Sequence, residues 1–160
     1  MKKQKKTFLI VSLIIISFFL NLFWEILHSL LYDWNILPHE NNVYFFIPII
    51  LFATLGDVFY ILIIFLLWSV VKKNVSWIYL PKGIDYIALS FFGIIFALFI
   101  EIKAKFLNLW QYNQYMPQIF GIGITPLIQL AVTSSLSLLI VNYYISNKRG
   151  INETKLRKTR

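Results

Sequence analysis

Four long apolar segments constrain this chain more than any other feature of its sequence. They cover residues 8–32, 46–71, 84–107 and 118–146. Each is longer than the roughly 20 residues that a helix needs to cross about 30 Å of hydrocarbon. The chain is 59% hydrophobic and has a mean hydropathy of +0.71, which exceeds the apolar share of a typical water-soluble domain. The sequence predicts an all-α, integral membrane four-helix bundle, with residues 1–146 as a single transmembrane domain.

The lysines and arginines predict how this bundle is oriented. Four crossings place thirteen of the fifteen basic residues on one side: four in the N-terminal tail, three within residues 72–82 and six in residues 147–160. Only Lys103 and Lys105 fall on the other side. Because cytoplasmic segments carry an excess of Lys and Arg, we expect both termini in the cytoplasm. The net charge of +8 then reflects topology, and no nucleic-acid partner is expected. The basic tail 147–160 is predicted to be disordered.

Tryptophan and tyrosine residues lie near the predicted ends of the helices. Such residues often anchor a membrane protein at the two bilayer interfaces. The residues predicted as anchors on the outer side are Trp34, Trp110, Tyr112 and Tyr115, and those on the cytoplasmic side are Trp68, Trp77 and Tyr79.

Polar or small side chains recur at helical spacing in every apolar segment. Steps of three or four residues keep them on one face of a helix. The four stripes are Ser17, Asn21, Glu25, His28 and Tyr32; Ala53, Asp57 and Tyr60; Ser90, Gly93, Ala97 and Glu101; and Thr125, Gln129, Thr133 and Ser137. For the small and hydroxyl residues, helix packing and interhelical hydrogen bonds are a sufficient explanation.

The carboxyl groups in these stripes need a stronger explanation. A charged side chain inside a bilayer costs several kcal/mol unless it is paired, protonated or hydrated. Glu25, Asp57 and Glu101 all fall in the outer half of the predicted helices, as does Gln129. We therefore expect them to share a buried acidic pocket with His28. Because carboxylates side by side in a low dielectric repel one another, at least one is expected to be protonated, or a cation to be present.

Proline and glycine interrupt the fourth segment near its start. Pro117 suits the first turn of a helix, whereas Pro126 removes a backbone hydrogen bond inside the predicted helix. Gly121 and Gly123 lie just before it. The segment predicts either a broken helix whose free carbonyls line a binding site or a plain proline kink.

Seven short stretches together form a recognisable pattern. They are Trp24-Glu25, Gly56-Asp57, Glu101, Trp110-Gln111-Tyr112, Met116-Pro117, Gly121-Ile122-Gly123 and Pro126-Leu127-Ile128-Gln129. The pattern resembles that of an uncharacterised family of small four-helix bacterial inner-membrane proteins, and the resemblance covers nearly all of the chain except its tails. It implies a location in the bacterial plasma (inner) membrane and supports these positions, but it implies no activity. His28 lies outside the pattern.

Metal chemistry is a limited alternative for the same residues. Glu25 and His28 form a Glu-x-x-His motif, which carboxylate-bridged di-iron bundles use twice, with two further glutamates. This chain has one copy, so a complete two-metal site is not expected. A single-metal site at Glu25, His28, Asp57 and Glu101 is the remaining metal hypothesis. The absence of cysteine excludes thiolate ligands and cysteine nucleophiles.

Three functions fit the predicted pocket. In the first, it binds or acts on a lipid-like or isoprenoid molecule, with Glu25, Asp57 and Glu101 as candidate acids or bases. The candidate substrate-binding residues are Asn21, His28, Trp110, Tyr112 and Gln129. In the second, the protein is a structural or accessory subunit of a membrane complex, paired with another membrane protein. In the third, it is a small proton- or cation-coupled transporter, which functions alone or as a homo-oligomer. The sequence identifies no cofactor and does not decide whether the protein is an enzyme.

Overall fold

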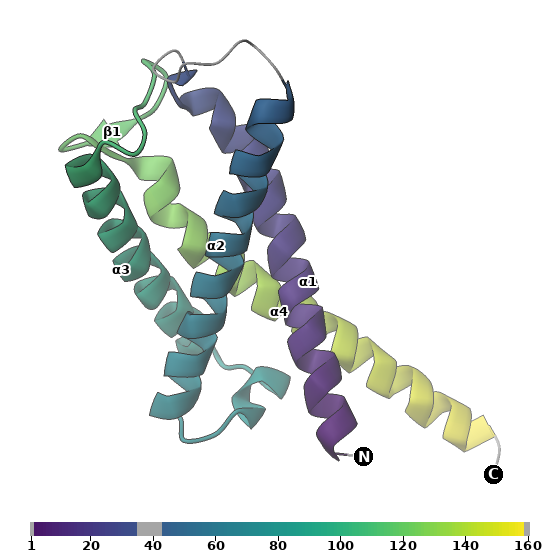
Figure 1. Ribbon diagram of the computed structural model, residues 1–160. Helices are drawn as coiled ribbons and strands as arrows, with labels where there is room; N and C mark the ends of the chain where they lie inside the picture. Colours follow the sequence, from purple (N-terminus) through teal and green to yellow (C-terminus); the bar gives the residue numbers. More distant parts are fainter. Residues whose placement is uncertain (1, 35–42, 159–160) are drawn as a thin grey trace.

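Four long helices make up most of the computed structural model of this chain (Figure 1). The structure describes the backbone of residues 2–34 and 43–158 and the side chains of residues 7–34 and 45–146. The helices are α1 (Lys2–His28), α2 (Val43–Val71), α3 (Gly83–Leu107) and α4 (Ile124–Lys158). Each contains a stretch long and apolar enough to cross a membrane. The predicted all-α membrane bundle is therefore confirmed as the fold class.

The two ends of the bundle carry different connections. At one end, which we call the terminal end, α1 begins, α4 ends, and η3 (Ser76–Tyr79) lies between α2 and α3 (Figure 1). The opposite end, which we call the hairpin end, carries η1 (Ser29–Leu31) and the short strands β1 (Gln118–Ile119) and β2 (Ile122–Gly123). Most of the predicted loop between α1 and α2, residues 35–42, lies outside the described residues.

The predicted start of the fourth helix at residue 118 is wrong, because a β-hairpin occupies that position. β1 pairs antiparallel with β2, and the turn between them holds Phe120 and Gly121 at positive φ. The helix begins only at Ile124. Pro126 then falls in the first turn, where a backbone N–H has no partner within the helix. It therefore neither breaks nor kinks α4.

The other end of α4 extends beyond the predicted membrane segment. Its bounds include residues 147–158, whose side chains lie outside the described residues. The predicted disorder of this basic tail stays a prediction.

Large buried apolar side chains are concentrated in the half of the bundle nearer the terminal end. This cluster includes Leu9, Leu13, Ile61, Ile64, Phe65, Trp77, Ile78, Leu89, Leu138 and Val141. The outward faces of the helices are also apolar, as the exposed Phe19, Phe52, Phe59 and Phe99 illustrate. Because lipid is as apolar as these side chains, close packing and hydrogen bonds hold such helices together.

Small side chains bring α3 and α4 into direct backbone contact. A Cβ atom added to Gly93 would lie 2.5 Å from the backbone nitrogen of Ala131. Ala97, one turn further along α3, is also buried. The glycine and alanine of the third predicted stripe therefore serve helix packing, as expected for small residues in membrane helices.

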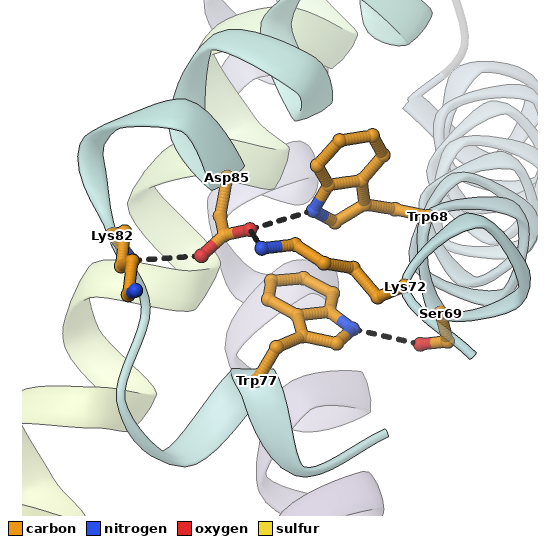
Figure 2. Close-up of polar contacts among 6 residues, drawn as sticks. All are labelled: Trp68, Ser69, Lys72, Trp77, Lys82 and Asp85. Carbon is orange, nitrogen blue, oxygen red and sulfur yellow. Dashed lines mark hydrogen bonds and ion pairs between the residues drawn. The ribbon is translucent and has the colours of Figure 1, made fainter. Parts of the chain in front are cut away.

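Asp85 joins α2 to α3 at the terminal end (Figure 2). Its Oδ1 lies 2.8 Å from Lys72 Nζ and accepts a hydrogen bond of 2.8 Å from Trp68 Nε1. Its Oδ2 accepts the backbone N–H of Lys82 at 2.7 Å, as an acid in the first turn of a helix often does. The side chain of Asp85 is 1% exposed, whereas that of Lys72 is 28% exposed.

The two tryptophans near this ion pair donate hydrogen bonds within the protein. Trp77 donates a hydrogen bond of 2.9 Å from Nε1 to Ser69 Oγ (Figure 2). It is buried and stacks on Phe65. The prediction that Trp77 anchors the protein in the bilayer interface is therefore wrong. Trp68 is half-buried, and its indole N–H is directed to Asp85.

Replacing Gly93 by alanine tests the contact between α3 and α4. The added methyl group has to push two backbones apart, so we expect Gly93→Ala to lower the free energy of unfolding by about 1–3 kcal/mol. Gly56→Ala is the matched control, because a Cβ at Gly56 has no neighbouring heavy atom within 4 Å. It should be neutral or stabilising, by up to about 1 kcal/mol. Denaturant titration in detergent measures both, and equal losses would contradict the proposed contact.

A double-mutant cycle tests the ion pair. Lys72→Met leaves Asp85 buried and charged, so we expect a loss of about 3 kcal/mol in the free energy of unfolding. Asp85→Asn should cost less, because the partly exposed Lys72 can extend its ammonium group to water. The double variant should recover part of the loss caused by Lys72→Met. Strictly additive losses, measured by the same titration, would show that the two side chains do not interact.

Candidate functional site

Polar side chains of α1 and α4 face each other from the middle of the bundle to the hairpin end. Ser17 Oγ donates a hydrogen bond of 2.9 Å to Ser137 Oγ, and His28 Nε2 lies 2.8 Å from Thr125 Oγ1. Ser17, His28 and Ser137 are buried. The predicted stripes on the first and fourth helices therefore form one polar contact between them.

Gln129 holds two carboxyl groups from two other helices. Its Nε2 donates to Glu25 Oε1 at 2.7 Å and to Asp57 Oδ2 at 2.6 Å. These bonds use both N–H groups of the amide, and Asn21 Oδ1 is a more distant neighbour at 3.4 Å. The carboxyl groups of Glu25 and Asp57 also lie within hydrogen-bonding reach of each other. Carboxyl groups this close repel unless one of them holds a proton.

Glu101 belongs to a second polar group. The hydroxyl of Tyr112 donates to Glu101 Oε2, and Trp110 Nε1 donates to the Tyr112 hydroxyl at 3.1 Å. The backbone of Gly123 forms a further hydrogen bond to this carboxylate. A Cβ at Gly123 would lie 3.0 Å from Cζ of Tyr112, so only glycine lets the ring lie so close. Trp110 and Tyr112, predicted both as anchors and as substrate-binding residues, thus form part of a chain that ends at Glu101.

Tyr32 lies between the two groups. Its ring centroid is 4.9 Å from that of His28 and 5.4 Å from that of Tyr112. A backbone bridge between Tyr32 and Tyr112 and a hydrogen bond of 3.0 Å from Asn113 N–H to the Leu31 carbonyl hold the end of α1 against the loop after α3. Burial, and then the charges of Tyr112 and the nearby acidic side chains, raise the pKa of Tyr32. The hydroxyl is therefore neutral at physiological pH.

His28 carries an unmatched polar atom. Within the described side chains, its Nδ1 is the one buried nitrogen or oxygen without a hydrogen-bond partner, and the residue is 3% exposed. Thr125 Oγ1, the neighbour of Nε2, donates its single proton to Met116 Sδ at 3.1 Å. In the tautomer whose Nε2 carries the proton, Thr125 accepts from Nε2–H and Nδ1 keeps a free lone pair.

The structure thus brings Glu25, Asp57 and Gln129 into direct contact and leaves Glu101 in a separate group. Sequence reasoning placed Tyr32 on the first stripe by its four-residue step but did not count it as a site residue. It also missed Asp85 and Lys72; the available signal was an acid in the first turn of a helix. Across the described residues, no three histidine, aspartate or glutamate side chains gather closely enough to hold a metal ion. The structure therefore offers no ligand set for the single-metal hypothesis.

Comparison of the chain with protein-family models, with curated proteins and with solved structures finds no match. The resemblance to a family of bacterial inner-membrane proteins therefore stays a prediction.

Removing the amide that joins the carboxyl groups should destabilise the bundle. Gln129→Leu leaves Glu25 and Asp57 without their shared donor, and we expect a loss of about 2 kcal/mol or more in the free energy of unfolding. Ser90→Ala removes a single hydrogen bond of 3.1 Å between α3 and α4 and should cost about 0.6 kcal/mol. Denaturant titration in detergent compares the two variants. Similar losses would mean that Gln129 does not link the helices more strongly than an ordinary hydroxyl pair.

Proposed function

We propose that this multi-pass membrane protein binds a lipid-like molecule in the hairpin half of its bundle. Glu25 and Asp57 would exchange a proton with the bound molecule, and Gln129 would hold the two carboxyl groups in position. The observation that carries the proposal is the contact between these carboxyl groups and a single amide on α4. We further propose that the protein lies in a bacterial plasma membrane with both termini in the cytoplasm, which the distribution of lysine and arginine supports.

The chemistry of the carboxyl pair supports a role in proton transfer. Two carboxyl groups that share one proton present an acid and a base at the same place. Because they come from different helices, a small movement of α1 against α2 would change how the proton is shared. General acid–base catalysis uses groups of this kind.

The surroundings of the pair support a ligand that arrives from the bilayer. Glu25 and Asp57 are half-buried within segments that can span a membrane. The neighbouring Phe23, Phe52 and Leu55 are exposed, so the surface at this depth is apolar. A molecule with an apolar body and a polar head could keep its body in lipid while its head reaches the carboxyl groups.

The shared proton also supports a second function, that of a small proton-coupled transporter. Release of the proton would leave two like charges in contact and favour separation of the helices that carry them. Flux driven by a pH gradient in proteoliposomes and abolished by Asp57→Asn would establish transport. An accessory subunit would show neither ligand binding nor flux and would instead copurify with a partner at fixed stoichiometry.

Native mass spectrometry of the detergent-purified protein tests the binding proposal. We expect the wild-type protein to retain a lipid-like molecule, and Glu25→Gln and Asp57→Asn each to reduce its occupancy about tenfold, which corresponds to about 1.4 kcal/mol. Glu153→Gln makes the same chemical change in the basic tail and should retain wild-type occupancy. Circular dichroism verifies the fold of each variant. Equal occupancy in all four folded proteins, or no retained molecule in any, would contradict the proposal.

A further inference from the structure

We infer that the head of the bound molecule is a cation that carries N–H donors, such as a primary ammonium group. This inference rests on the proposed binding function and adds the chemical class of the ligand. It follows from two independent observations: the charge balance inside the hairpin half and the one buried polar atom that remains unmatched there.

Among the described side chains, the interior of the hairpin half holds acidic groups and no lysine or arginine. Glu25, Asp57 and Glu101 are three of the seven acidic residues of the chain. Among the described side chains at this end, the only lysines are Lys103 and Lys105, and both are exposed. Lys105 Nζ donates to the carbonyl of Phe120 at 2.9 Å. If the carboxyl pair keeps one proton, it still carries one negative charge, and no cationic side chain in the described part of the chain is paired with it.

His28, one helical turn beyond Glu25 on the same face of α1, carries the one unmatched buried polar atom among the described side chains. His28 Nδ1 is buried and has no partner within the described residues, and in the tautomer whose Nε2–H donates to Thr125 it keeps a free lone pair. The ring of Tyr32 lies against that of His28, and a tyrosine hydroxyl can accept a hydrogen bond. An ammonium group has three donors and no acceptor, so it can meet lone pairs of His28, Tyr32 and a carboxylate together.

Other ligand heads leave this arrangement unbalanced. A phosphate brings negative charge and acceptors to a place that already has both, which raises the energy of the complex. A neutral alcohol supplies a single donor and no charge. A second proton on the carboxyl pair would neutralise the charge but leave His28 Nδ1 unpaired. Of these heads, only a cationic donor both balances the negative charge and donates hydrogen bonds to the lone pairs.

Three single-chain amphiphiles that differ only in their heads test the inference. Dodecylamine, dodecanol and dodecyl phosphate are titrated into the full-length protein in a non-ionic detergent, and native mass spectrometry measures saturable binding. We expect dodecylamine to bind at least tenfold more tightly than dodecanol, and dodecyl phosphate to show no saturable binding. The double variant Glu25→Gln/Asp57→Asn removes the charge whichever carboxyl group carries it and should weaken amine binding about tenfold, whereas Glu153→Gln should not change it. Tyr32→Phe should weaken it less, because it removes one acceptor and no charge.

The outcomes separate this inference from the function on which it rests. Saturable binding of dodecanol or dodecyl phosphate that is tighter than that of dodecylamine would overturn the cationic head and leave lipid-like binding intact. No saturable binding of any of the three would overturn both. Amine binding that is unchanged in the folded double variant would place the cation elsewhere and also overturn the inference.

Discussion

The amide of Gln129 is the interaction on which the polar half of this bundle depends. A carboxyl group inside a bilayer must find its partners within the protein, because lipid provides no hydrogen bonds. Gln129 uses both of its N–H groups to meet this need for Glu25 and Asp57. In doing so it fixes α4 against α1 and α2 at one point. The position of the carboxyl pair, and with it any chemistry of the pair, follows from this single side chain.

The two halves of the bundle differ in how fully their polar groups are paired. The terminal half holds the large apolar core and the ion pair between Lys72 and Asp85, whose groups all have partners. The hairpin half holds half-buried carboxyl groups and a buried histidine with an unmatched nitrogen. Buried ionisable groups are expensive in a membrane and usually mark a functional site. A well-packed terminal half lets the chain tolerate them at the other end.

Periodicity predicted much of this arrangement and failed where local backbone geometry decided the outcome. The four helices and the inward faces of Glu25 and Gln129 follow from apolar length and from steps of three or four residues. The hairpin before α4 does not follow from periodicity. Its turn places Phe120 at positive φ, a conformation for which phenylalanine has no preference. The separation of Glu101 from the carboxyl pair could not be predicted from periodicity either. It depends on Tyr112, which a loop rather than a helix brings to Glu101.

The start of α4 at Ile124 helps to determine which carboxyl group lacks a nearby positive charge. Because the helix begins at Ile124, its N-terminal end, which carries a partial positive charge, lies next to Gly123. The backbone of Gly123 and the hydroxyl of Tyr112 both form hydrogen bonds with Glu101. Local donors therefore partly balance the negative charge of this carboxylate. Glu25 and Asp57 instead share the neutral amide of Gln129. A helix that began at residue 118 would have removed this distinction, and with it the reason to assign a cation to the pair rather than to Glu101.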